Sequence, residues 1–164
     1  MKNRDMRQQL VQLGNGAHAL ATQMLGDVDD AADAVHDAFV KALGKPDAYN
    51  PNTGPLTPWF LRVVRNHCID LIRRRRPAYE DVDKLSDPEP GPLSSLETAE
   101  RDQELRSALT KLSNEQRQII VLRDYMDLSY AEIGAVLDIV QGTVMSRLHR
   151  ARMALKEELG HHGL

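Results

Sequence analysis

Apolar residues recur every three or four positions along three stretches of the first half of the chain, which is the spacing of amphipathic helices. The first stretch carries Leu10, Leu13, Ala17, Leu20, Ala21 and Met24. The second carries Ala32, Val35, Phe39, Ala42 and Leu43, and the third carries Trp59, Phe60, Val63, Val64, Ile69 and Ile72. Gly14 and Gly16 weaken the first helix, whereas Thr57 followed by Pro58 predicts the start of the third.

The second half repeats this pattern in shorter units. A further apolar stripe consists of Leu105, Ala108, Leu109 and Leu112. Two capping boxes, Ser113 with Gln116 and Ser129 with Glu132, predict the starts of two more helices. Because no stretch alternates apolar and polar residues as a strand does, the sequence predicts an all-α fold.

Two proline-rich segments separate these helices. The segment 44–58 holds four of the eight prolines, which predicts an extended loop. The segment 77–95 holds the other four and is acidic, and such a composition buries too little apolar surface to order itself. We therefore expect two small helical domains, 1–76 and 96–164, joined by a flexible acidic linker over 77–95.

The stretch 129–152 has the features of a helix-turn-helix. Gly134 is small enough to let two helices cross closely, and Asp138 tolerates the positive φ that the turn requires. The second helix then faces Val144, Leu148, Ala151 and Leu155 inward. It leaves six polar residues outward, namely Gln141, Thr143, Ser146, Arg147, His149 and Arg150. Residues 139–156 contain four Lys or Arg and no acid, which favours DNA reading over an ordinary helical hairpin with a solvated basic face.

The net charge limits how such a helix can work. The 164 residues carry a formal charge of −3, distributed as +3 over 1–76, −5 over 77–99 and −1 over 100–164. Because a free-standing DNA binder usually has a basic surplus, we expect DNA contact to depend on local patches or on a partner. Cys68 is the one cysteine, which excludes an internal disulfide and a Cys-based zinc cluster. The chain has neither a long apolar run nor a start of signal-peptide type, so a cytoplasmic location is expected.

Three segments, in order, resemble bacterial sigma factors. "LSNEQRQIIVLRDYMDLSYAEIGAVLDIVQGTVMSRLHRARMALKEEL" resembles their fourth conserved region. "DVDDAADAVHDAFVKAL" resembles the polymerase-binding helix of their second region, and "YNPNTGPLTPWFLRVVRNHCIDLIRRRR" resembles the promoter-melting segment that follows it. With no first or third region, the chain resembles the compact extracytoplasmic-function (ECF) group. The resemblance implies a dissociable specificity subunit of RNA polymerase that is not itself an enzyme and needs no cofactor.

The resemblance also implies roles for individual residues. The six outward residues on the second helix of the helix-turn-helix would read the −35 element in the major groove. The loop 49–57 would hold a base flipped out near −10. The −10 contacts would come from Trp59, Arg62, Arg65, Asn66, Asp70, Arg73 and Arg74. The polymerase clamp helices would bind Asp30, Asp33, His36 and Asp37. The partners would be core polymerase, through the clamp helices of its largest subunit and its flap, promoter DNA and an anti-sigma factor, with no insertion into a membrane.

Several residues keep a second interpretation. Trp59 stands at the start of an apolar stripe and would equally serve the core, Asn66 would equally cap local backbone, and the run Arg73–Arg76 would equally offset the helix dipole. Asp29, Asp30 and Asp33 match a magnesium–diphosphate motif, but that chemistry needs a second acidic cluster, which only the linker offers. Met145, Val140 and Asp138 replace the basic residue, proline and glycine that are frequent in sigma factors.

Two other classes of protein remain open at this point. A dimeric helix-turn-helix regulator would share the C-terminal pattern but leaves the Asp-rich helix, the proline loop and the Arg run unexplained. A decoy that titrates an anti-sigma factor would need no DNA reading at all, so loss of Arg147 and Arg150 would leave it active.

Overall fold

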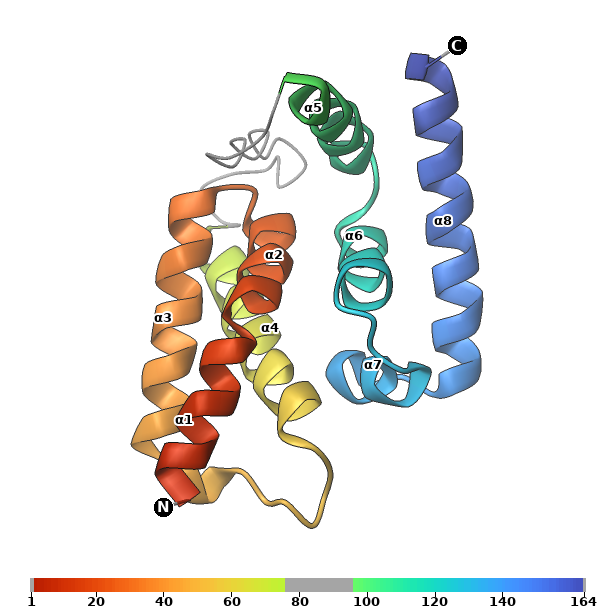
Figure 1. The fold of residues 1–164 in the computed structure, drawn as a ribbon. Coiled ribbons are helices and arrows are strands. Elements are labelled where there is room, and N and C mark those ends of the chain that lie inside the picture. Colours follow the sequence, from red (N-terminus) through yellow and green to blue (C-terminus); the bar gives the residue numbers. More distant parts are fainter. Residues whose placement is uncertain (1, 76–95, 164) are drawn as a thin grey trace.

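The computed structural model describes residues 2–75 and 96–163, and within these residues the chain is helical and contains no strand. The N-terminal half consists of α1 (Lys2–Gln12), α2 (Gly14–Leu25), α3 (Val28–Gly44), the 3₁₀ turn η1 (Pro46–Ala48) and α4 (Leu56–Arg75). The C-terminal half consists of α5 (Leu96–Thr110), α6 (Asn114–Ile120), the π-helical turn η2 (Val121–Tyr125), α7 (Tyr130–Leu137) and α8 (Gln141–Gly163). The prediction of an all-α fold is confirmed (Figure 1). The predicted linker lies outside the described residues.

In the N-terminal half, α2, α3 and α4 pack around a core of Leu, Ala and Phe side chains. Phe60 is fully buried and its ring lies 5.0 Å from that of Phe39. Asp27 caps α3, because its carboxylate accepts hydrogen bonds from the backbone N–H groups of Asp29 and Asp30 at 2.9 Å. Two details of the predicted pattern are wrong. Ala32 is exposed because the buried face of α3 runs through its neighbours instead, and α4 begins at Leu56, before Pro58.

The C-terminal half confirms the predicted capping boxes and turn, whereas the predicted apolar stripe of α5 is wrong at Leu105, which is exposed. Both capping boxes form, with Ser113 and Ser129 each accepting from the backbone N–H three residues later. Asp138 ends α7 in the left-handed region, at φ 58° and ψ 49°. A Cβ added at Gly134 would lie 2.6 Å from the backbone oxygen of Ile139, so only glycine permits this approach. The stretch is a helix-turn-helix in geometry as well as in sequence.

The two halves are in direct contact. One continuous hydrophobic cluster runs from the side chains of α1–α4 into those of α5–α8. On one side of the contact lie α2 and α4, and on the other lie α6, η2 and α7 (Figure 1). We call this contact the seam. The sequence predicted two tethered domains, but it contained no signal that they would pack together.

Candidate nucleic-acid interface

The recognition helix α8 presents its predicted DNA-reading side chains to solvent. Gln141, Ser146, Arg147, His149 and Arg150 are exposed and Thr143 is half-buried, whereas Val144, Leu148 and Ala151 are buried beneath them. This division follows from the helical period, since the buried residues recur at intervals of three or four. Met145, at 55% exposure, lies on the same side as the polar residues. The structure therefore brings together all six residues predicted for −35 reading.

The predicted −10 residues of α4 are more scattered. Arg62, Asn66, Asp70, Arg73 and Arg74 are exposed along the helix. Two others are turned away from that exposed row. Trp59 is half-buried, with its ring 5.2 Å from that of Tyr49, and Arg65 is half-buried against the C-terminal half.

The environment of Arg65 is unusual for an arginine that is predicted to bind DNA. Its Nε donates a 2.7 Å hydrogen bond to Oε1 of Gln118, a residue of α6 that is only 4% exposed. Burial lowers the pKa of the Arg65 guanidinium, and the charges of Arg62 and Arg147 lower it further, while Glu115 and Asp138 oppose the shift. Arg147 of α8 and Arg65 of α4 are therefore close enough to repel one another across the seam.

The loop before α4 is held in one conformation by its own side chains. Tyr49 donates its hydroxyl to the carbonyl oxygen of Gly54 at 2.7 Å, and Asn50 accepts from the backbone of Asn52 and Thr53. Gly54 adopts φ 154°, a conformation that L residues rarely take. Because these contacts hold the loop in one conformation, it can form a wall of a pocket.

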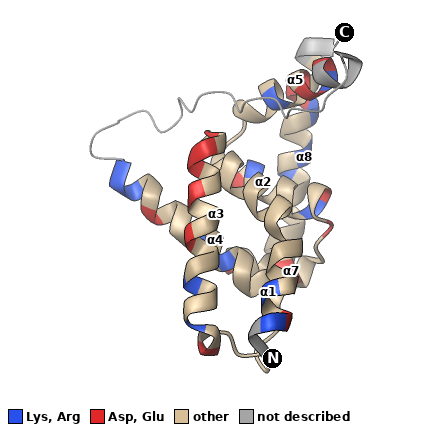
Figure 2. Cartoon of the chain, turned by 60° about the vertical axis from the view of Figure 1, so that its left-hand side comes forward, with Lys and Arg blue, Asp and Glu red and all other residues tan. Residues whose placement is uncertain are grey.

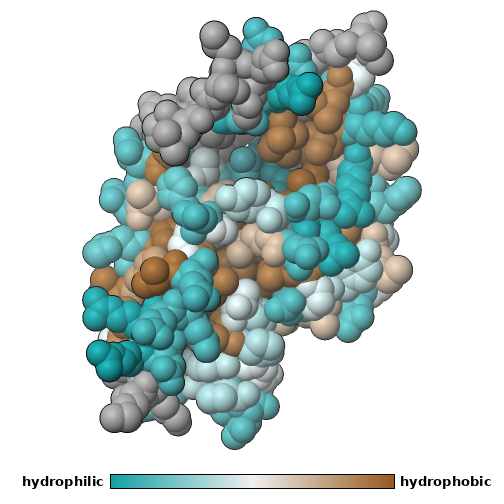
Figure 3. Space-filling view, viewed as in Figure 1, coloured by the Kyte–Doolittle hydropathy of each residue, from teal (hydrophilic) through white to brown (hydrophobic). Residues whose placement is uncertain are grey.

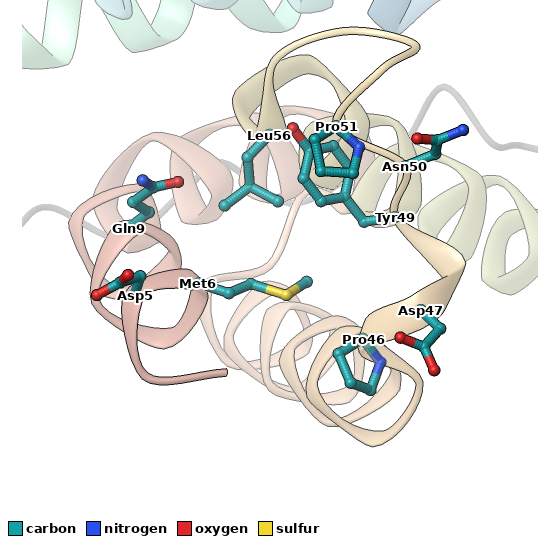
Figure 4. A pocket seen from close by; sticks show the side chains of 9 residues that line it. All are labelled: Asp5, Met6, Gln9, Pro46, Asp47, Tyr49, Asn50, Pro51 and Leu56. Atoms are coloured by element: carbon teal, nitrogen blue, oxygen red, sulfur yellow. The ribbon is translucent and has the colours of Figure 1, made fainter. Parts of the chain in front are cut away.

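A pocket of about 450 Å³ opens between this loop and the N-terminal helix. Met6 and Leu56 extend into it, and Tyr49 and Pro51 cover one side (Figure 4). Its remaining lining residues are Asp5, Gln9, Pro46, Asp47 and Asn50. The volume falls within the usual range for small-ligand sites, about 300–1,000 Å³. Sequence reasoning found the loop but missed the contribution of α1, because nothing in the local pattern says which helix faces a loop.

The acidic face of α3 lies beside the basic end of α4 (Figure 2). Asp30 pairs with Arg75 at 2.8 Å between Oδ2 and Nη2. Asp37 pairs with His67 at 3.2 Å, and the other ring nitrogen of His67 lies 3.2 Å from Nζ of Lys41. The remaining two residues predicted for polymerase binding, Asp33 and His36, are exposed.

A second, more apolar groove runs between the halves. It is formed by α2, α5, η2 and Leu155, and apolar side chains surround a hollow on this face of the molecule (Figure 3). Leu105 and Tyr125 in its walls are exposed, at 40% and 63%. Nη1 of Arg106 is buried there, and it is the one buried side-chain nitrogen or oxygen without a hydrogen-bond partner among the described residues.

The described residues offer neither a membrane-spanning helix nor a metal-binding cluster. No helix within 2–75 or 96–163 combines the length and apolar composition of a membrane span. In the same residues, no three or more His, Cys, Asp or Glu side chains gather where they would hold a metal ion.

Comparison with known proteins matches both halves to one family. Residues 10–78 match the model of sigma-70 region 2, and residues 102–155 match that of sigma-70 region 4. The chain is 33% identical to the ECF RNA polymerase sigma factor SigE of Mycolicibacterium smegmatis over 88% of its length, and it spans 58% of that relative. It is 31% identical to SigW of Bacillus subtilis, covering 87% of this chain and 82% of SigW.

A solved structure agrees with these sequence matches. The sigma factor RpoE of Bartonella quintana, in complex with the anti-sigma factor NepR, superposes with a TM-score of 0.80 and 30% identity, covering 96% of this chain and 98% of RpoE. The exposed basic recognition helix, the acidic α3 and the ordered loop before α4 occupy the two matched regions. The chain belongs to the ECF RNA polymerase sigma factors.

Proposed function

We propose that this sigma factor directs core RNA polymerase to promoters by reading −35 through α8 and −10 through α4 and the loop before it. The observation that carries the proposal is the helix-turn-helix geometry, with five exposed polar side chains and the half-buried Thr143 above a buried Val144–Leu148–Ala151 row. Exposed Arg147 and Arg150 are placed to contact guanine edges or phosphates in a major groove. The division into domains 1–76 and 96–164 with a linker over 77–95 is part of this proposal.

We assign the pocket between α1 and the 49–55 loop to the flipped −10 base. Flipping costs a few kcal/mol of unstacking, so a pocket that exists before DNA arrives lowers the net cost. The Tyr49–Gly54 and Asn50–Thr53 hydrogen bonds support such a preformed site. The apolar side chains of Met6 and Leu56 would contact the face of the base, and Asn50 and Gln9 would supply donors and acceptors at its edge.

We assign polymerase docking to the acidic face of α3. Asp33 and His36 are exposed, and Asp30 and Asp37 reach that face while paired with α4. Acids arranged in this way speed and orient association with a basic partner more than they strengthen it. The proposed partner surface is the clamp helices of the largest polymerase subunit, with the flap receiving the C-terminal half.

We also infer an anti-sigma partner and a cytoplasmic site of action. The structural neighbour RpoE is held by an anti-sigma factor, and the groove between α2 and α5 offers apolar surface to such a protein here. The chemistry of transcription belongs to the polymerase, so this chain would be a specificity factor and not an enzyme. A dimeric regulator is the weaker alternative, because it gives the acidic α3 no role.

In-vitro transcription with purified core polymerase tests the proposal. We expect the chain to direct initiation at discrete sites on genomic fragments. Arg147→Ala with Arg150→Ala should abolish that selection, while Arg101→Ala, an exposed arginine on α5, should leave it unchanged. Initiation that is equally random with and without the chain would refute the proposal. Recruitment to a palindrome without polymerase would favour the dimeric regulator instead.

A further inference from the structure

Three of the seven exposed large apolar side chains in the described residues belong to α8 or to the residue just before it. Val140 is 72% exposed, Met145 is 55% exposed and Met153 is 52% exposed. Val140 and Met145 lie at the N-terminal end of the helix, which begins at Gln141. One exposed apolar residue is normal on a protein surface. Two of them at the end of a helix that is proposed to enter the major groove call for a cause.

Val140 occupies the N-cap position of α8, where its side chain does not support the helix. Its carbonyl oxygen accepts a backbone hydrogen bond from the N–H of Val144 at 3.1 Å, as that of an N-cap residue does. Valine is a poor N-cap, because it has no side-chain oxygen to accept from the free N–H groups of the first turn. Helices α6 and α7 begin instead with Ser113 and Ser129, whose hydroxyls accept such bonds. The helix that is proposed to read DNA therefore lacks the side-chain cap that its two neighbours have.

Met145 lies outside the buried row of α8 and among exposed residues. Its neighbours on the helix surface are the residues three and four positions away. On the solvent side these are Gln141, Gly142 and His149, which are all exposed. A Cβ added at Gly142 would meet no atom within 4 Å, so the surface beside Met145 is open. Packing within the chain therefore does not account for a methionine at this position.

The surroundings of these two side chains match one feature of B-DNA. Thymine presents its C5-methyl group in the major groove, and apolar side chains contact that methyl, whereas polar side chains read the donors and acceptors of the bases. Residues 139–156 contain four Lys or Arg and no acid, which suits the phosphates on both sides of the groove. DNA is thus an occupant that fits both the apolar pair and the charge around it.

We propose that Val140 and Met145 read thymine methyl groups of the −35 element. The inference rests on the proposed promoter function and adds apolar contacts to the polar ones that the six predicted residues would make. It requires an A·T pair wherever either side chain meets a base edge. The N-terminal residues of a recognition helix are those that meet base edges. Met153 lies about 12 Å further along α8, at 1.5 Å a residue, and so serves as the internal control.

Deoxyuridine tests the inference, because it differs from thymidine in its base only by lacking the methyl group. The full chain is assembled with core polymerase, and a promoter that this holoenzyme selects is prepared with each −35 thymine of either strand replaced in turn. Competition with the unmodified promoter measures binding. A methyl group in an apolar contact contributes about fourfold in affinity. We therefore expect the parent to lose about fourfold at one or two thymines and to be unaffected at the others.

Two results with the parent holoenzyme would overturn the inference. One is equal binding after replacement of every −35 thymine, and the other is a selected −35 element that contains no A·T pair. In either case the proposed promoter function would stand, because the chain would still direct polymerase to a site. If the parent directs polymerase to no site at all, the promoter function fails first and this inference fails with it.

Alanine variants assign each methyl group to one side chain. Met145→Ala should bind the unmodified promoter about fourfold more weakly and should no longer distinguish thymine from uracil at its own position. Val140→Ala should do the same at a different thymine, whereas Met153→Ala should keep the preferences of the parent. Alanine is used at position 145 because a lysine would turn its charge towards phosphate and add a contact of its own. Full thymine preference in both Met145→Ala and Val140→Ala would contradict the assignment.

Val140→Ser separates reading of the base from stability of the helix. A serine hydroxyl at the N-cap can accept from the free N–H groups of the first turn, so we expect the melting temperature to rise by about 2 °C or more. The thymine preference assigned to Val140 should be lost at the same time, because both of its methyl groups are removed. A stabilised Val140→Ser variant that keeps this preference would show that Val140 does not contact the base.

Discussion

The helix proposed to read −35, α8, and the helix proposed to read −10, α4, carry similar arginines in opposite circumstances. On α8 the polar row stands free above a buried apolar row, so Arg147 and Arg150 need no rearrangement to meet DNA. On α4 the row is interrupted, because Arg65 is bound to Gln118 and Arg62 lies beside Asp138. The difference shows that having the right residues on a helix is not sufficient for reading. Access to them is governed by what the rest of the chain packs against that helix.

The largest expected effect comes from disrupting the close crossing of α7 and α8, which supports the exposed face of α8. Gly134→Leu would place a side chain against the backbone of Ile139, which cannot move without breaking the turn. We expect a loss of about 3 kcal/mol or more in the free energy of unfolding, and hence a melting temperature lower by about 6 °C or more. Thermal unfolding followed by circular dichroism measures it. A shift below 2 °C would mean that the crossing of α7 and α8 is looser than the structure shows. Gly142→Ala, with open space around its added Cβ, is the matched control.

The next effect compares an exposed arginine with a half-buried one. Arg147→Ala should weaken promoter binding by the holoenzyme about tenfold and leave thermal stability unchanged, because its side chain has no hydrogen-bond partner among the described contacts. Arg65→Ala should also lower stability, since it leaves buried Gln118 without a donor. Equal melting temperatures for the two variants would contradict the inference that Arg65 stabilises the fold and Arg147 does not.

A smaller effect should come from adding a charge to the exposed row. Met145 lies at 55% exposure among the polar residues of α8, and Met145→Lys would add one phosphate contact. We expect the logarithm of the binding constant to fall about one unit more steeply with the logarithm of salt concentration. Fluorescence anisotropy over a salt series measures the slope. The same slope as the parent would show that this position does not reach the DNA backbone. Met153→Lys, which is similarly exposed further along α8, serves as the control.

The smallest effect concerns the turn that touches α4. Asp138→Gly keeps the left-handed conformation and removes the carboxylate beside Arg62. Because both partners are largely exposed, the pair contributes about 0.5 kcal/mol, so DNA binding by the free chain should rise only about twofold. Asp138→Asn offers a control that keeps the shape of the side chain and should behave in the same way. A tenfold rise would mean that the turn, and not Gln118, dominates the seam.

Local physics made much of this fold predictable. The capping boxes at Ser113 and Ser129, the positive φ of Asp138 and the close approach at Gly134 depend on residues a few positions apart, so the sequence displays them. The outward row of α8 follows from helical period alone. These elements account for the all-α fold and for the face of α8 that is proposed to read −35.

The seam and the pocket were not predictable in the same way. Arg65 and Gln118 are 53 positions apart, and neither residue type is unusual on a helix surface. In the sequence Gly14 and Gly16 only weaken a helix, and the packing of Met126 is what shows the space that Gly16 provides. Likewise Met6 and Gln9 join the pocket only because α1 folds over the loop. Contacts between residues that are far apart in the chain produce no periodic pattern in a single sequence.

The burial of Cys68 has a consequence for the signals this protein can sense. The thiol is fully buried within the core of the N-terminal half, and burial raises its pKa to about 12. At neutral pH about one molecule in 10⁵ therefore carries the thiolate that peroxides attack. Oxidants therefore meet no reactive thiol in this protein, so a thiol-based response to oxidative stress must reach this sigma factor through another molecule.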